Sequence, residues 1–175
     1  MTKRYSNFTD SEKEFYFFLG LLSTKFAVME YRLLQFLGGL IIDDFVLTNT
    51  IFEKNSLYQN IELIKEINKK RKFQKSAVDK LIEQISNIRG KRNLFIHGIW
   101  GEPISKENDL IINCDEPKLD YSEERLIGGL MSQSWRSVKS YEFRLSYIKK
   151  LVENLNDIIY TQEFLIEKLK EHVFD

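Results

Sequence analysis

Residues 89–100 read Arg-Gly-Lys-Arg-Asn-Leu-Phe-Ile-His-Gly-Ile-Trp, and the helical pattern that leads into this stretch decides the fold. The pattern predicts a helix that begins near residues 74–77 and stops at Gly98, a natural left-handed end. Gly90 weakens such a helix by about 1 kcal/mol relative to Ala, which suggests either close packing of another backbone or a local loosening. The apolar stripe of this helix comprises Val78, Leu81, Ile82, Ile85, Ile88 and Phe95.

An arginine falls inside this apolar stripe. At 100° per residue, Arg92 lies about 20° from the direction of Leu81. A guanidinium keeps its charge, so this placement is costly unless a carboxylate, a ligand or a second chain meets it. Glu30 is a candidate partner, although the plainer interpretation places Glu30 in solvent or beside charges on other elements. Asn93 and His97 are four residues apart on the adjacent flank.

Three further helices are expected from apolar residues that recur every three or four positions. The first spans residues 9–41 and is apolar over most of its circumference. The second spans residues 56–72, after a connection at 44–56 that has room for a short helical turn. The last runs from about Tyr141 to His172, with Ser140 as its N-cap, and is long enough to pack along the first helix.

The region 99–139 breaks the helical pattern and is expected to be a small insertion that carries a β-hairpin. Residues 110–114 form a short apolar run between polar and proline-containing segments, which predicts a strand. Residues 135–138 are expected to form a second strand that pairs with it. Residues 120–131 are ambiguous: residues 122–127 fit a helical turn, which Gly128 and Gly129 would break. The resulting fold class is all-α: an antiparallel bundle of four principal helices with a hairpin insertion after the third.

The composition of the 175 residues suits one soluble globular domain, with 43% hydrophobic and 30% charged residues. The apolar run from Phe15 to Val46 contains several charged residues and predicts a buried core helix rather than a membrane span. Cys114 is the only cysteine, which excludes an internal disulfide and suits a reducing cytoplasm. With only two histidines, far apart, a histidine-based metal site is not expected, and no cofactor motif is present.

Charge is distributed unevenly although the net charge is zero. Between Lys65 and Arg92 there are ten basic and three acidic residues, a local balance of 10 − 3 = +7. Such a cluster would attract the phosphates of a nucleic acid. A solvated polar face of two helices explains it equally well.

The segment Arg92-Asn93-Leu94-Phe95-Ile96-His97 resembles the Arg-(four to six residues)-His motif of the HEPN superfamily. A polar residue follows the arginine and a small residue follows the histidine, as in that motif, and the order of the surrounding helices also fits. The resemblance implies a helical bundle that acts as a homodimer, with two motifs facing each other. Many members are metal-independent endoribonucleases of toxin–antitoxin and other defence systems.

The resemblance implies that His97 transfers the proton, that Arg92 stabilises charge on the phosphate and that Asn93 orients the reacting groups, with Arg89 and Lys91 as further RNA contacts. The cut would use the RNA's own 2′-hydroxyl and leave a 2′,3′-cyclic phosphate. An antitoxin or another defence protein is the expected partner. Position 99 is Ile, so the modification that some family toxins receive on a Tyr at this place is not expected.

Purely structural roles are also open for the same residues. His97 suits a helix C-terminus, where the last carbonyls and the helix dipole satisfy it. Arg92 suits a buried ion pair with a carboxylate such as Glu30. The alternative function is therefore a non-catalytic helical module that binds RNA, a nucleotide or another protein.

Overall fold

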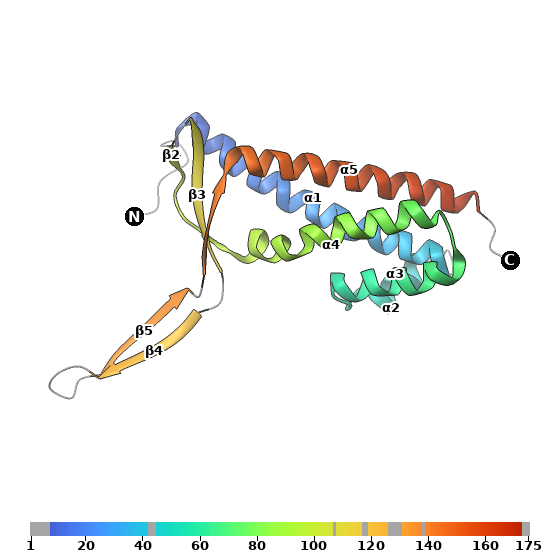
Figure 1. Cartoon of the computed structure of the whole chain (residues 1–175), viewed down its shortest axis with the longest axis horizontal. Helices are drawn as coiled ribbons and strands as arrows, with labels where there is room; N and C mark the ends of the chain where they lie inside the picture. The colour runs from blue at the N-terminus through green and yellow to red at the C-terminus, as the bar shows by residue number, and fades with distance from the viewer. Residues whose placement is uncertain are drawn as a thin grey trace. The chain divides into compact units, whose positions relative to one another are not determined.

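The computed structural model describes residues 8–41, 45–106, 108–116, 119–125, 131–137 and 139–172, and the chain is mostly helical with small antiparallel sheets (Figure 1). The described helices are α1 (Asp10–Ile41), α2 (Phe45–Phe52), α3 (Leu57–Arg71), α4 (Lys75–His97) and α5 (Leu145–Lys170). The chain divides into two compact units, and the division falls within α1, α4 and α5. The first unit comprises residues up to Leu19 and Asn93–Lys149, and the second comprises Gly20–Arg92 and Lys150–Asp175.

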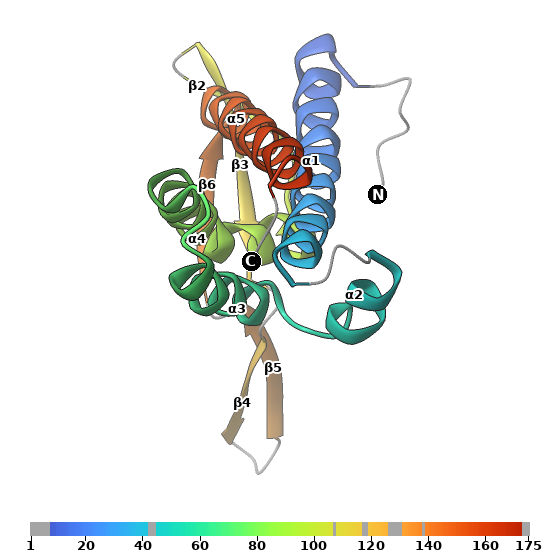
Figure 2. The same ribbon diagram turned by 90° about the vertical axis from the view of Figure 1, so that its right-hand side faces the viewer.

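The second unit is purely helical in its described part. Ser56 caps α3 and forms a reciprocal capping box with Gln59. Residues 72–74 then turn the chain so that α3 and α4 lie side by side (Figure 2). Lys72 and Gln74 make this turn with φ values of 56° and 39°. Side chains from α1, α3, α4 and α5 form the core: Leu22, Phe26, Met29, Leu33, Phe36, Leu37, Leu40, Ile61, Ile64, Leu81, Ile85 and Leu155.

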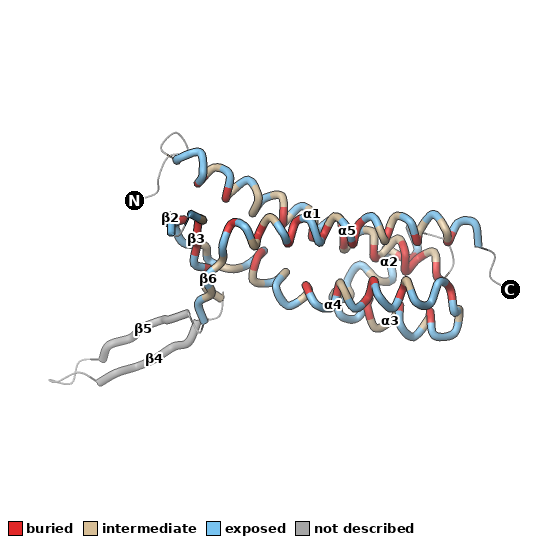
Figure 3. The backbone as a smooth tube through the Cα atoms, turned by 45° about the horizontal axis from the view of Figure 1, so that its top comes forward, coloured by how far each residue is buried: buried red, intermediate tan, exposed pale blue. Residues whose placement is uncertain are grey.

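The first unit contains the strands β1 (Ile99–Trp100), β2 (Ile104–Lys106), β3 (Asp109–Asp115), β4 (Leu119–Arg125), β5 (Met131–Ser137) and β6 (Ser140–Arg144). The central strand β3 pairs antiparallel with β1, β2 and β6. Buried side chains in this unit include Phe15, Phe95, Ile111, Ile112 and Ile148. Figure 3 shows how buried positions recur along the helices, as the apolar periodicity predicts.

The all-α expectation with a single hairpin needs correction. Residues 110–114 do form a strand, β3, but its partners are β1, β2 and β6. The expected partner, residues 135–138, is wrong: residues 131–137 form β5 and pair with β4 in a separate two-stranded sheet. Residues 119–125 are therefore a strand rather than a helical turn. The connection at 44–56 holds α2, a complete short helix.

The expected start of the last helix near Tyr141 is also wrong. Residues 140–144 form β6, and Phe143 lies opposite Ile112 of β3. Half-buried and exposed positions alternate along β6, so the aromatic side chains at 141 and 143 lie on one face of the strand. Helix α5 begins only at Leu145, and Ser140 does not cap it.

Candidate functional site

The last turns of α4 carry the residues that the sequence singled out. The helix continues without a break through Gly90 to His97. A Cβ added at Gly90 would meet nothing within 4 Å among the described residues. Close packing of another backbone is therefore not the reason for a glycine at this position, and the local loosening suggested by the sequence stays a prediction.

Arg92 forms an ion pair with Glu30 of α1 inside the second unit. Arg92 Nε donates to Glu30 Oε1 at 2.6 Å, and Nη2 donates to Oε2 at 3.2 Å. The two side chains are 27% and 29% exposed. Of the two positions that the sequence allowed for Glu30, the structure has the one beside Arg92. A forked contact of this kind fixes the orientation of the guanidinium plane. It also explains how α4 tolerates a cation on its apolar face.

His97 and Asn93 belong to the first unit and are both exposed. His97 is the last residue of α4. Its ring has no hydrogen bond or ion pair to any residue that the structure describes, so the interpretation in which nearby carbonyls satisfy the ring finds no support. Arg92 precedes His97 by five residues on the same helix, and their convergence on one phosphate stays a prediction.

Gly98 ends α4 for a different reason from the one expected. Its backbone is not in the left-handed region, and its N–H donates to Leu94 O at 2.8 Å. A Cβ at this position would collide with Cys114 Sγ and with the Leu94 carbonyl. The glycine therefore allows β3 to approach the end of the helix. Burial, followed by the charge of Asp115, raises the pKa of Cys114 to about 11, so this thiol is not a nucleophile.

The neighbouring cations lie at the surface of the second unit. The Arg89 guanidinium lies over the Tyr58 ring at 4.6 Å from its centroid, and Tyr58 is 52% exposed. Lys91 is exposed. Within the basic segment, Lys65 pairs with Glu62 and Lys75 with Asp79. Six of its lysines in α3, α4 and the turn between them are also exposed: Lys65, Lys69, Lys70, Lys72, Lys75 and Lys80.

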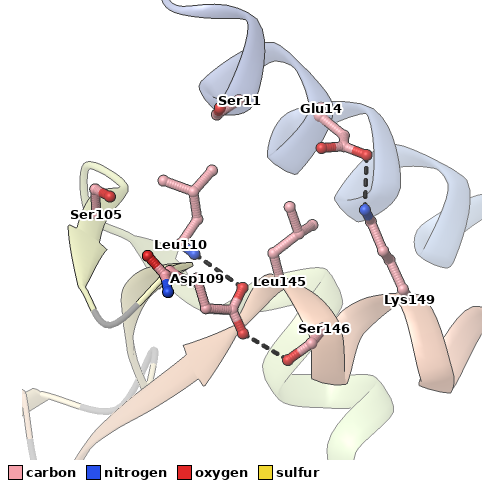
Figure 4. Close-up of a pocket in the computed structure, with 9 residues that line it drawn as sticks. Ser11, Glu14, Ser105, Asp109, Leu110, Leu145, Ser146 and Lys149 are labelled. Atoms are coloured by element: carbon pink, nitrogen blue, oxygen red, sulfur yellow. Dashed lines mark hydrogen bonds and ion pairs between the residues drawn. The ribbon is translucent and has the colours of Figure 1, made fainter.

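A cleft with a volume of about 410 Å³ lies in the first unit (Figure 4). Glu14 and Lys149 pair across it at 2.7 Å. Asp109 Oδ2 accepts the Ser146 hydroxyl at 2.6 Å, and Oδ1 accepts the Leu110 N–H at 2.8 Å. Glu14 and Lys149 are thus engaged with each other and Asp109 with Ser146 and Leu110, as expected of contacts that hold the unit together.

Asp109 also replaces the N-cap that α5 lacks. Its carboxylate accepts the backbone N–H of Ser146 in the first turn of α5 as well as the hydroxyl. Burial acts to raise the pKa of Asp109, but the bonds from Ser146 and Leu110 and the charge of Arg144 together lower it. The carboxylate therefore stays charged at the positive end of the helix dipole. The sequence did not reveal this cap, because its residues lie 37 positions apart.

A second cleft lies between α4 and α5 in the second unit, and we call it the carboxamide groove. Its volume is about 240 Å³, and it is lined by Gln84, Asn87, Ile88, Asn154, Asp157 and Ile158. Ile88 and Ile158 are buried, 7% and 2% exposed. The four polar side chains make no hydrogen bond or ion pair with any described residue, so their bonding groups face solvent.

The sequence carries a signal for this groove that a search for apolar periodicity and catalytic motifs overlooks. Gln84-x-x-Asn87-Ile88 on α4 and Asn154-x-x-Asp157-Ile158 on α5 share one pattern, two polar residues three apart followed by an isoleucine. Positions three and four apart lie on one face of a helix. Two helices that pack through the isoleucines therefore place the polar residues along the same groove.

The described residues offer neither a metal cluster nor a single membrane-spanning helix. No group of three or more His, Cys, Asp and Glu side chains that could hold a metal ion is present among them. Within the same ranges, no single helix has both the length and the apolar composition needed to cross a bilayer. Helices α1 and α2 taken together would meet both requirements, but the pair is bent at its junction.

The chain was also compared with known proteins. No family model, curated protein or solved structure matches it.

Proposed function

We propose that the chain is a HEPN-type, metal-independent endoribonuclease, and that its helices form the bundle of that superfamily. His97 is the proton-transfer group, because histidine is the side chain suited to general acid–base catalysis and this one is exposed. Arg92 stabilises the charge that builds up on the phosphate oxygens. Asn93 orients the imidazole or the ribose. Arg89 and Lys91 contact the neighbouring phosphates.

The observation that carries the proposal is the forked Arg92–Glu30 pair. It fixes the plane of a guanidinium that keeps more than a quarter of its side chain in solvent. An exposed histidine ends the same helix five residues later. A fixed cation and an exposed imidazole are the two groups that metal-free cleavage through the 2′-hydroxyl requires.

Two motifs from two copies of the chain would complete the site in a homodimer. The expected partners are RNA and an antitoxin or another defence protein, and the expected location is the cytoplasm. Light scattering or sedimentation of the purified chain tests the dimer. A strictly monomeric chain that still cleaves RNA would refute the paired-motif arrangement.

The cleavage test uses purified chain, mixed RNA and an excess of chelator. The expected products carry 2′,3′-cyclic phosphate and 5′-hydroxyl ends. His97→Ala and Arg92→Ala abolish cleavage while thermal unfolding stays cooperative. His172→Ala removes the other histidine of the chain and serves as the matched control, with its activity retained. Equal RNA cleavage by the His97→Ala variant and the parent would show that a contaminating nuclease is responsible, and it would refute the proposal.

One observation favours a second function, a non-catalytic helical module that binds RNA, a nucleotide or another protein. Glu30 already supplies Arg92 with a carboxylate, so the pair serves stability alone in a protein with no chemistry to perform. RNA binding without any cyclic-phosphate product supports this module. Loss of folding in both the His97→Ala and Arg92→Ala variants would also favour it.

A further inference from the structure

The carboxamide groove offers hydrogen-bonding groups that the described protein does not use. Gln84, Asn87 and Asn154 each present a carbonyl oxygen and an NH₂ group, and Asp157 presents acceptors only. Ile88 and Ile158 supply an apolar floor. Such a surface suits a flat, uncharged ring that has both donors and acceptors on its edge.

The size of the groove restricts the ligand further. Sites for drug-sized ligands usually enclose about 300–1,000 Å³, whereas this groove has about 240 Å³. It therefore accommodates a single ring system rather than a whole cofactor. A nucleobase has the right size, flatness and mixture of donors and acceptors.

We propose that the carboxamide groove binds an adenine base of single-stranded RNA. The inference rests on the proposed function for the presence of RNA, and it adds a base preference. Asn and Gln side chains form two hydrogen bonds with adenine, at its N6 and N7 atoms. Guanine is usually recognised by Arg or Lys, which bind its O6 and N7 atoms. No cation is among the described residues that line the groove. Asp157 accepts from the exocyclic amine, a group that uracil lacks.

The position of the groove on α4 connects it to the phosphate-binding residues. Lys91 follows Asn87 by one turn on the same face of the helix, about 6 Å along its axis. Lys91 is exposed, and its charge attracts a phosphate. The carboxylate of Asp157 repels phosphate from the opposite wall. A nucleotide with its base in the groove thus directs its backbone toward Lys91.

The test compares short oligoadenylate with oligouridylate on the full chain carrying His97→Ala, so that the RNA is not cut. We expect about tenfold tighter binding of oligoadenylate. Asn154→Ala and Asp157→Ala, both at exposed positions of α5, each reduce this ratio several-fold. Glu153→Ala removes an adjacent exposed charge outside the groove and leaves the ratio unchanged.

A second measurement identifies the groove directly. Adenosine monophosphate is expected to shift the side-chain NH₂ resonances of Gln84, Asn87 and Asn154 in a ¹⁵N spectrum, and uridine monophosphate is not. A response to the free nucleotide combined with no preference for oligoadenylate would overturn the assignment to RNA.

The outcomes separate this inference from the nuclease proposal. Equal binding of the two RNAs, or a preference that survives both α5 variants, overturns the groove assignment. Cleavage by the parent chain without an adenine preference refutes the groove alone. An adenine preference that the α5 variants abolish, in a parent chain that never cleaves, supports the groove and refutes the nuclease.

Discussion

Arg92 donates to both carboxylate oxygens of Glu30, through Nε at 2.6 Å and Nη2 at 3.2 Å. The pair joins residues 62 positions apart, between α1 and α4 of the second unit. It stabilises the contact between the two helices, and it fixes the direction of the guanidinium. The Arg92–Glu30 pair would have the same geometry whether it only stabilises the fold or also positions Arg92 to bind a phosphate. A variant must therefore separate the two roles.

Glu30→Gln provides this separation. Loss of the charge leaves a partly buried guanidinium without its ion pair, and we expect the free energy of unfolding to fall by about 1–2 kcal/mol. RNA cleavage should fall at least about tenfold, because a misplaced catalytic group loses this much. Urea unfolding and the cleavage assay measure the two effects.

The control for this variant is Glu163→Gln, which breaks the 3.0 Å pair between Arg32 and Glu163 elsewhere in the second unit. This pair has one bond and more exposed side chains, so the variant should lower stability by at most about 1 kcal/mol and leave the cleavage rate unchanged. Full cleavage activity in Glu30→Gln would show that Glu30 does not position Arg92.

Sequence periodicity predicted the helices because burial imposes a regular spacing on them. The first helix was expected at 9–41 and spans Asp10–Ile41, with Phe26, Leu33 and Phe36 among its buried residues. The short apolar run at 110–114 predicted β3 equally well. Helix α1 buries residues three and four positions apart, whereas β3 buries the consecutive residues Leu110, Ile111 and Ile112, so in each case the local pattern of apolar residues carries the information.

The start of α5 was mispredicted because its determinants are not local. Ser140 followed by Glu142 has the composition of a helix start, but pairing with β3 holds these residues in a strand. The acceptor for the first turn of α5 then comes from Asp109, on a different strand. For the same reason the Arg92–Glu30 pair was only one of two possibilities in the sequence. Partners that are distant in sequence leave no periodic trace.

Two glycines of the motif stretch should respond in opposite ways to alanine. Gly90→Ala fills open space in a helix interior, and we expect stabilisation by about 1 kcal/mol because Ala is the better helix former. Gly98→Ala forces a methyl group against Cys114 Sγ and the Leu94 carbonyl, and a loss of about 1–3 kcal/mol is expected.

Urea unfolding of both glycine variants measures these changes, with the parent chain as reference. A destabilised Gly90→Ala variant would mean that position 90 contacts something that the described residues do not include, such as a second copy of the chain. Stabilisation by Gly98→Ala would contradict the close approach of β3 to the end of α4.

The Asp109 cap predicts a specific dependence of stability on pH. The pKa of this carboxyl is lower in the folded state than the ordinary value of 3.8. Its contribution to folding is therefore complete above about pH 4 and is lost as the pH falls through the lower, folded-state value. Asp109→Asn keeps an oxygen acceptor but removes the charge, so it should lower the free energy of unfolding at neutral pH by about 0.3–1 kcal/mol, the usual value of a negative charge at a helix N-terminus.

The difference between the parent and Asp109→Asn should shrink as the pH falls below the ordinary value of 3.8, measured by urea unfolding at neutral and acidic pH. Ser146→Ala retains the carboxylate but removes the hydroxyl donor, so it should raise the pKa of Asp109 toward its ordinary value. A difference between parent and Asp109→Asn that stays constant down to acidic pH would show that the charge of Asp109 does not cap α5.

RNA binding should depend on salt through the exposed lysines of α3 and α4. For single strands, the logarithm of the binding constant falls with the logarithm of salt concentration with a slope of about −0.7 per phosphate neutralised. Replacement of Lys69, Lys70 and Lys80 by Gln should therefore make the slope shallower by about 2. Lys168→Gln with Lys170→Gln is the matched control, because these lysines pair with Glu171 and Glu167. An unchanged slope in the triple variant, or an equal change in the control, would place the RNA away from the basic segment.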